Sequence, residues 1–468
     1  MYQFTEWPAE PDRIGRYRFF EQLYDGEHEK AFERKIYKPR SQAGGDGLTW
    51  LEFDYPRIIV DVATNLLVSE PPVISYADKT LNEALKRVTN RSRFSAILME
   101  VAQGSAMRGD GVFVVRNSAR GVVIEPQPAY SYYPELDPDN CREVLSEQLA
   151  WTRDFEGRQV LRVDRYENGQ IVREAYWFRR MAVGARIAGT VLSRVLGGDE
   201  VIPTGLKDRN TIVHVPNQRK DNDFFGKSDL GGGLPSLFGE INWRASQISK
   251  ILDRHADPKM SGPKIKLPPG MENLDLSQSN YFAVGKDDPA PTYLIWDAQL
   301  ISATEHYKRL ETEILRHSET AAVLAGKIEG ARFDSARAYR IQLAPTLAKN
   351  SRKRTHLDPA VKETLRIAVA MELGIRFEDV PDPSVRWRDG LPKDTAEASQ
   401  TENNRIASKT SSRLSSIRRL DDCDEPTALE ELERIAHEQE KFGAVEMPPT
   451  TPESDTTPEP EDESEIDE

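Results

Sequence analysis

Residues 226–260 read GKSDLGGGLPSLFGEINWRASQISKILDRHADPKM and carry a long helical pattern. After the glycines Gly231–Gly233, apolar residues recur at steps of three and four from Leu234 to Leu252. This spacing predicts one amphipathic helix of about 25 residues, because side chains at such steps lie on one face. Pro258 ends the pattern, since a proline inside a helix removes a backbone hydrogen bond.

The sequence after this helix predicts a hairpin. Residues 258–297 contain repeated Pro and Gly between short β-rich runs, which indicates a compact, strand-containing insertion. Residues 298–320 return to the helical spacing of apolar side chains. We therefore expect a long helix that leaves, a small β unit, and a long helix that returns.

Beyond the hairpin, residues 321–333 (AAVLAGKIEGARF) contain two glycines that interrupt regular structure. A helix is expected from Asp334, a plausible N-cap, past a kink or break at Pro345, to Gly374 as the C-cap residue. The pattern that follows predicts a short strand at 384–390 and charged helices at 393–441.

The chain before the hairpin predicts helices followed by strands. Helical spacing of apolar residues comes first, and short β-rich runs separated by turns come second. The expected elements are helices at 13–38, 54–69 and about 80–108, the last broken near Arg91, and then a mainly antiparallel β region at 110–216 that opens with a hairpin of 111–117 and 121–127.

The 468-residue chain has a net charge of −14, and most of this negative charge lies in its last residues. Residues 446–468 contain ten of the acids and no Lys or Arg, so the rest of the chain has a net charge of only −4. This acidic, Pro- and Thr-rich tail cannot form a core and is predicted to be disordered. The mildly acidic remainder lacks the basic excess of proteins that grip nucleic acid tightly.

Several classes of protein are disfavoured by what the sequence lacks. Two distant cysteines, Cys141 and Cys423, do not make a disulfide scaffold, and they fit a reducing cytoplasm. The seven histidines show no HxxxH spacing and no CxxC exists, so we expect no metal site. No apolar stretch approaches the ~20 residues of a membrane span, and the N-terminal residues do not resemble a signal peptide.

The tripeptide Gly226–Ser228 (GKS) matches the end of a phosphate-binding P-loop. That loop also needs a glycine five residues earlier, so that open backbone amides can surround the phosphates. Asp221 occupies that position, and the bulky Phe224 and Phe225 follow it. We interpret the tripeptide as a turn into the long helix, and we expect no catalytic residue and no cofactor.

Basic side chains cluster in a few places. Lys349, Arg352, Lys353 and Arg354 are close together in the sequence, and Lys327 and Arg332 occur in the glycine-flanked segment 321–333. Taken alone, such clusters are best interpreted as solvated charge.

Three strings carry a resemblance to a known family. The first is 226–260, with a Gly-x-Ser entry into a long helix and the pair Ile241-Asn242. The second is ARFDSARAYRIQLAPTLAKNSRKR (331–354), where Ala336 replaces the glycine of the family's entry into its next helix. The third is VRWRDGLPKDTAEASQTENNRIASKTSSRLSSIRRL (385–420), a strand, a proline-acid turn, a helix and a Ser-rich turn. In this order, they resemble portal proteins of long-tailed bacteriophages over nearly the whole chain.

The resemblance implies an α+β portal fold with a mixed α/β wing, long stem helices, a small β-containing clip, a helical crown and a disordered acidic tail. The implied divisions are the wing at 1–225, stem helices at 226–257 and 298–320, the clip at 258–297, the tunnel loop at 321–333, a wing helix at 334–378, the crown at 379–445 and the tail at 446–468. Its implied site residues are Val323, Leu324, Lys327, Ile328 and Arg332 in the tunnel loop, and Lys264 and Lys266 in the clip.

The implied function is structural and not enzymatic. Portal subunits form a ring, usually of twelve, whose channel passes double-stranded DNA into and out of the capsid. The partners so implied are other copies of the chain, transient non-specific DNA, the terminase large subunit, the head–tail adaptor, and major capsid and scaffolding proteins, with no membrane. The implied location is the unique vertex of the virion, with assembly in the host cytoplasm.

Two alternatives stay open at this point. One is a non-portal DNA-processing ATPase, which only the GKS tripeptide supports. The other is a scaffold protein that uses its long helices for protein contacts alone.

Overall fold

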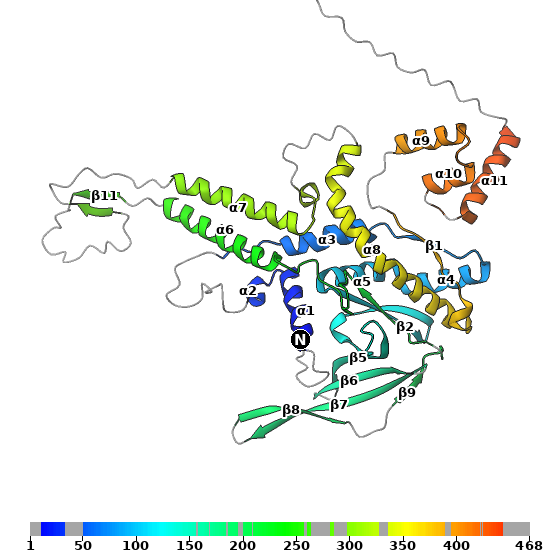
Figure 1. Ribbon diagram of the computed structural model, residues 1–468, viewed down its shortest axis with the longest axis horizontal. Coiled ribbons are helices and arrows are strands. Elements are labelled where there is room, and N and C mark those ends of the chain that lie inside the picture. Colours follow the sequence, from blue (N-terminus) through cyan, green and yellow to red (C-terminus); the bar gives the residue numbers. More distant parts are fainter. Residues whose placement is uncertain are drawn as a thin grey trace, which may run out of the picture. The chain divides into compact units, whose positions relative to one another are not determined.

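The chain folds into two compact units, residues 1–392 and 393–468, and each is described by itself. The computed structural model describes residues 11–32, 50–155, 158–167, 169–183, 186–194, 200–207, 209–256, 260–263, 281–284, 297–326, 336–388, 395–421, 423 and 425–442. Helices and sheets both contribute to the larger unit, so the fold class is α+β, as expected (Figure 1).

The larger unit begins with helices. Between Tyr24 and His28 the chain turns at Gly26, whose φ of +76° ends the first helix, so the continuous helix expected over 13–38 is wrong. The predicted break near Arg91 lies at Arg93, which adopts a left-handed φ of 55° between two helices. The helices are α1 (Pro11–Tyr24), α2 (His28–Ala31), α3 (Tyr55–Val68), α4 (Lys79–Ser92) and α5 (Phe94–Arg108).

Two antiparallel sheets follow, as the alternating runs predict. The predicted hairpin forms strands β2 (Asp110–Ser118) and β3 (Gly121–Gln127), and β10 (Ile212–Pro216) completes a three-stranded sheet in the order β10-β2-β3. The second sheet runs β4-β5-β6-β7-β8, with β9 paired to β7. Its strands are β4 (Tyr132–Leu136), which follows the short helix η1 (Ala129–Ser131), β5 (Val144–Phe155), β6 (Arg158–Glu167), β7 (Gln170–Val183), β8 (Arg186–Arg194) and β9 (Glu200–Pro203).

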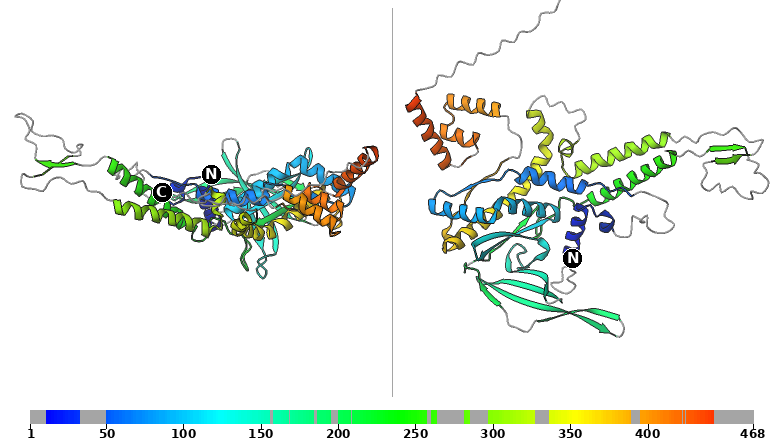
Figure 2. Two further views of the ribbon diagram at one scale, coloured as in Figure 1. Left: turned by 90° about the horizontal axis from the view of Figure 1, so that it is seen from above. Right: turned by 180° about the vertical axis from the view of Figure 1, so that it is seen from behind.

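The expected hairpin is formed by α6 (Leu234–Ala256) and α7 (Asp297–His317). The two helices lie side by side, as Figures 1 and 2 show. Between them in the chain, β11 (Met260–Pro263) and β12 (Tyr281–Val284) pair in parallel, so the insertion contains strands as predicted. The short helix η2 (Ala322–Ala325) follows α7.

The longest helix, α8 (Ala336–Leu373), has 38 residues. It continues through Pro345 and Pro359, so the break expected at Pro345 does not occur. A proline removes one helical hydrogen bond, and buried apolar residues on either side, such as Leu343 and Leu357, hold the helix by packing. Gly374 ends it with a φ of +66°, as the C-cap pattern predicts.

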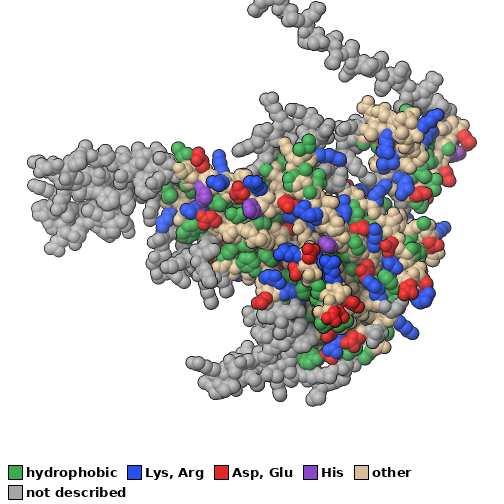
Figure 3. All heavy atoms as spheres, viewed as in Figure 1, with side chains coloured by type: hydrophobic (Ala, Val, Ile, Leu, Met, Phe, Trp, Pro, Cys, Tyr) green, Lys and Arg blue, Asp and Glu red, His purple; other side chains and the backbone are tan. Residues whose placement is uncertain are grey.

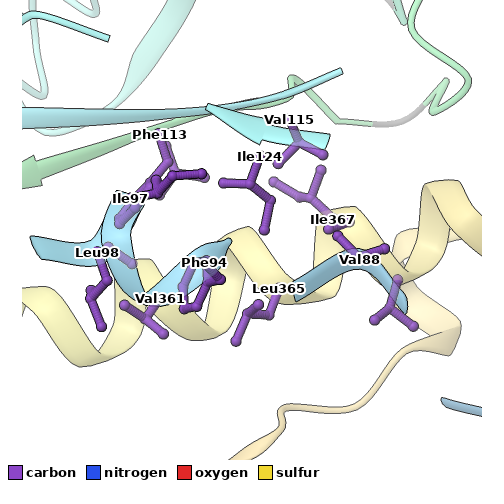
Figure 4. Packing of buried hydrophobic residues seen from close by; sticks show 14 of the residues in the cluster. Val88, Phe94, Ile97, Leu98, Phe113, Val115, Ile124, Val361, Leu365 and Ile367 are labelled. Atoms are coloured by element: carbon purple, nitrogen blue, oxygen red, sulfur yellow. The ribbon is translucent and has the colours of Figure 1, made fainter. Parts of the chain in front are cut away.

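The main core lies between the three-stranded sheet and the helices α4, α5 and α8. In Figure 4, Phe94 and Leu98 of α5 point toward Val361 and Leu365 of α8, while Phe113 lies on the sheet above them. All five side chains are buried. Burial of this cluster fixes α8 against the sheet, and therefore fixes the frame from which the hairpin extends.

The larger unit ends after a short strand. After η3 (Phe377–Asp379), β13 (Ser384–Arg386) pairs antiparallel with β1 (Val73–Ser75), and Trp387 donates from Nε1 to Asp358 Oδ1 at 2.7 Å. The second compact unit begins at Lys393, after this strand, which backbone pairing holds on the larger unit. The helices of the second unit are α9 (Thr395–Ala407), α10 (Arg413–Leu420) and α11 (Glu425–Phe442).

Candidate functional site

The tunnel-loop candidates divide into described and undescribed residues. Val323 and Leu324 belong to η2 and are partly buried against Leu66 of α3 and Leu343 of α8. Gly326 ends this turn with a φ of +83°. In the single chain, these two side chains anchor the start of the predicted tunnel loop. The other candidates, Lys327, Ile328, Arg332, Lys264 and Lys266, and the acidic tail lie outside the described residues.

The base of the hairpin is buried in a second hydrophobic cluster. Leu234, Phe238 and Ile241 near the start of α6 pack with Leu310 and Ile314 near the end of α7. Because the start of one helix meets the end of the other, α6 and α7 run antiparallel. Residues of α1, α3 and α5 complete this cluster, so the hairpin is fixed to the body at its base.

A buried ionic cluster adjoins this base. The carboxylate of Asp229, in the segment before α6, faces Lys349 Nζ at 3.1 Å and also binds Lys353 Nζ, both from α8. Its other oxygen accepts a hydrogen bond from Asn217 Nδ2 at 2.7 Å. Lys349 Nζ also donates to Ser318 O at 3.0 Å, just after α7. One carboxylate thus connects the entry to α6, the end of α7 and the middle of α8.

Burial and charge oppose one another in this cluster. Burial alone would raise the pKa of Asp229, but the ammonium groups of Lys353 and Lys349 hold it below its ordinary value. Burial lowers the pKa of Lys353 to about 8, against the attraction of Asp229. The single negative charge of Asp229 cannot neutralise both lysines. The stability of this cluster therefore depends strongly on Asp229.

The interpretation of Lys349 and Lys353 as solvated charge is wrong. Their side chains are only 4% and 3% exposed. The two lysines are four residues apart, which places them on one face of a helix and was the available signal. The buried carboxylate that pairs with them lies more than a hundred residues earlier, and no local pattern shows that pairing.

Backbone amides in and beside the GKS tripeptide donate to acceptors inside the protein. Gly226 N donates to Asp110 Oδ1 and Lys227 N donates to Gln218 O, each at 2.7 Å. Asp229 N donates to Ala106 O at 2.9 Å. Since these donors are used inside the protein, the segment forms a turn that closes onto α5 and β2, and these three amides are not free to bind a phosphate.

Asp110, at the start of β2, organises this turn further. Its Oδ2 accepts a hydrogen bond from Tyr17 of α1 at 2.6 Å, and its Oδ1 lies 2.7 Å from His214 Nε2 on β10. The ring of His214 stacks on that of Phe224, with ring centres 4.6 Å apart. Helix α1, two strands and the turn before α6 therefore meet at one buried carboxylate.

A buried acid, Glu147 of β5, behaves differently from Asp229. Its Oε1 accepts a hydrogen bond from Tyr132 at 2.8 Å, and no ion pair balances its charge among the described residues. Burial raises the pKa of Glu147 to about 7. The folded protein therefore binds a proton at this carboxyl that the unfolded chain loses at a lower pH.

We expect the substitution Glu147→Gln to stabilise the protein near pH 8 by on the order of 2–3 kcal/mol. Below about pH 4 the gain should vanish, because the carboxyl is then protonated in both states. Between the ordinary pKa and about 7, only the unfolded chain is ionised, so wild-type stability falls as pH rises. Urea unfolding followed by tryptophan fluorescence measures this difference. The exposed Glu143→Gln serves as control, and a pH-independent difference would contradict the account.

Two further properties of the described residues bear on the function. No helix among the described residues is both long and apolar enough to cross a membrane. In the same part of the chain, no group of three or more His, Cys, Asp or Glu side chains is placed to bind a metal ion.

Comparison with known proteins gives structural likeness without sequence relatives. No family model and no curated protein matches the chain. It is similar to a chain from the neck of an empty gene transfer agent particle computed with C6 symmetry, at a TM-score of 0.45 and 12% identity, covering 83% of this chain and 95% of that one. A chain from the virion of a native gene transfer agent particle gives a TM-score of 0.43 at 11% identity, covering 81% and 95%.

A third similar chain comes from the neck of a native gene transfer agent particle computed with C12 symmetry. Its TM-score is 0.36 at 12% identity, and the alignment covers 83% of this chain and 95% of that one. At such scores, the function of this chain has to be inferred from its own sequence and geometry.

Proposed function

We propose that this chain is the portal subunit of a tailed-phage particle, a ring-forming protein whose channel passes double-stranded DNA. The observation that carries the proposal is the succession of α6, a small strand pair, α7, a short turn at η2 and the long α8. This is the order of stem, clip, stem, tunnel loop and wing helix that the sequence resemblance implies. The buried base of the hairpin provides the fixed support that such a stem requires.

The charge of the chain fits a protein through which DNA passes better than a protein that binds DNA tightly. Lys and Arg side chains mix with Asp and Glu over the described face in Figure 3, without a broad basic patch. A channel with many phosphate contacts would slow the movement of DNA, because each neutralised phosphate adds salt-dependent affinity. With a net charge of −14, a ring of such subunits would hold DNA only loosely.

On this proposal the chain has no catalytic centre, and a separate ATPase supplies the energy for packaging. The insertion 258–297 would meet the terminase motor first and the head–tail adaptor later. The ring would sit at one vertex of the virion, after assembly with capsid and scaffolding proteins in the host cytoplasm. The subunit number proposed is twelve.

The far half of the hairpin offers a test of ring formation. Leu252 of α6 and Ile301 of α7 are 49% and 62% exposed, and the antiparallel pairing brings them to the same end. Neighbouring subunits would cover them in a ring. We expect Leu252→Asp with Ile301→Asp to reduce the ring to smaller species in sedimentation velocity, because a buried unpaired carboxylate is costly.

The control is Val201→Asp, which places one such carboxylate at a 53% exposed position on β9. It should leave the ring intact. A double variant that still sediments as a full ring would exclude the hairpin surface as a subunit contact. Tryptophan fluorescence should be unchanged in both variants, which separates lost assembly from lost folding.

A further inference from the structure

A cavity of about 870 Å³ lies beside the six-stranded sheet, away from the hairpin base. Tyr132 and Tyr166 line it from this sheet, His214 from β10, and Glu363 from α8. Its volume falls in the range of about 300–1,000 Å³ that is typical of small-molecule sites. Polar and charged side chains dominate its wall, which favours a charged ligand over an apolar one.

Arg219, shortly after β10, is the unusual group on this wall. Its side chain lies with the guanidinium carbon 5.5 Å from the centre of the Phe224 ring. Its Nε atom is fully buried and has no hydrogen-bond partner, and within the described ranges no carboxylate forms an ion pair with it. A buried charged donor without a partner is costly, and it often indicates an ion or ligand that completes the site.

A second guanidinium lies nearby. Arg142, in the connection between β4 and β5, lines the same cavity. Burial lowers the pKa of Arg219, and the charge of Arg142 lowers it further. The pKa of His356 on α8 falls through burial and then through the charges of Arg219 and Arg142. Three separate parts of the chain thus bring basic groups to one place.

Three carboxyl groups on the cavity wall are engaged by other partners or protonated. Glu363 forms an ion pair with Arg209, and Glu167 lies 3.5 Å from Arg165. Glu147 is bound by Tyr132 and keeps its proton up to about pH 7. Three of the four carboxyl groups on the wall are therefore paired or protonated. The fourth, the exposed Glu143, follows Arg142 in the chain, and the charge of Asp110 also attracts Arg219.

We propose that Arg219 and Arg142 bind a phosphate oxyanion at this cavity. The planar guanidinium fork matches two oxygens of a phosphate, and two such groups match its double charge. The buried Nε of Arg219 would then gain an acceptor. The phosphate comes either from a free small molecule or from the DNA backbone, and the site does not depend on ring formation because one chain supplies every residue.

Isothermal titration calorimetry of the full chain with inorganic phosphate, at constant ionic strength, tests the proposal. We expect saturable binding of one phosphate per chain, weakened at least about tenfold by Arg219→Gln and by Arg142→Gln, since each variant removes a charge-assisted hydrogen bond. Arg120→Gln, which changes an exposed arginine in the turn between β2 and β3, should bind like the wild type. Absence of binding, or equal weakening by all three variants, would overturn the proposal.

Two further experiments complete the test. The first identifies the source of the phosphate, and the second asks whether Arg219 has only a structural role. A short DNA duplex that displaces inorganic phosphate would identify backbone phosphate as the ligand, and failure to displace it would identify a free phosphate. In phosphate-free buffer, Arg219→Gln should leave the unfolding midpoint unchanged or raise it, because it removes an unpaired buried charge. A fall in this midpoint equal to that seen in phosphate would show that Arg219 acts in folding alone.

Discussion

Replacing Asp229 by alanine is expected to lower the free energy of unfolding of the larger unit by about 3–5 kcal/mol. The substitution leaves Lys349 and Lys353 buried without a counter-ion, and it removes one of the two acceptors of Asn217 Nδ2. All seven tryptophans precede residue 393, so tryptophan fluorescence during urea unfolding reports on this unit. The exposed Asp221→Ala, in a nearby turn, should change stability by less than about 0.5 kcal/mol.

A second variant distinguishes charge imbalance from lost contact. Combining Asp229→Ala with Lys353→Met removes one of the two uncompensated charges and should restore part of the lost stability. The account would be wrong if the single and double variants were equally unstable, or if Asp229→Ala unfolded like the wild type. Equal instability of the two variants would mean that lost contact, and not charge imbalance, causes the effect. Wild-type unfolding of Asp229→Ala would mean that the cluster does not hold the three long helices together.

Replacing Phe238 by alanine is expected to cost about 3–5 kcal/mol, as for other fully buried phenylalanines. Phe238 of α6 is completely buried in the cluster that joins the hairpin to α1, α3 and α5. Hydrogen exchange of the amides of α6 and α7 should accelerate more than that of α4, because the cavity opens at the hairpin base.

Ile341→Ala provides the control on another long helix. Ile341 of α8 is 66% exposed, so its truncation should change stability by less than about 0.5 kcal/mol. If Phe238→Ala were equally mild, the base of the hairpin would not be fixed by packing. Uniform acceleration of exchange over the larger unit would instead mean that the hairpin and the main core unfold together.

Local periodicity predicted most of the helices and strands, because burial on one side sets their spacing. The helices α3 and α6 and the hairpin of β2 and β3 follow this rule, while the end of α8 at Gly374 follows from the left-handed backbone that glycine adopts readily. The continuity of α8 through Pro345 did not follow, since packing from distant parts of the chain outweighs one lost hydrogen bond.

The candidate site was less predictable than the fold. Asp229 and the lysines that pair with it are far apart in sequence, so only the folded chain brings them together. Arg219 and Arg142 likewise come from separate turns that converge on one cavity. The GKS tripeptide was interpreted as a turn because the glycine that a P-loop needs five residues earlier is missing. The internal hydrogen bonds of the Gly226 and Lys227 amides agree with that interpretation.

Electron microscopy of the purified chain, combined with a solution mass from light scattering, tests the central claim most directly. The portal proposal predicts a homogeneous ring with an open centre and the mass of about twelve subunits, consistent with closed cyclic assembly. A compact particle without a central opening, or a stable monomer that remains so with its particle partners present, would contradict it.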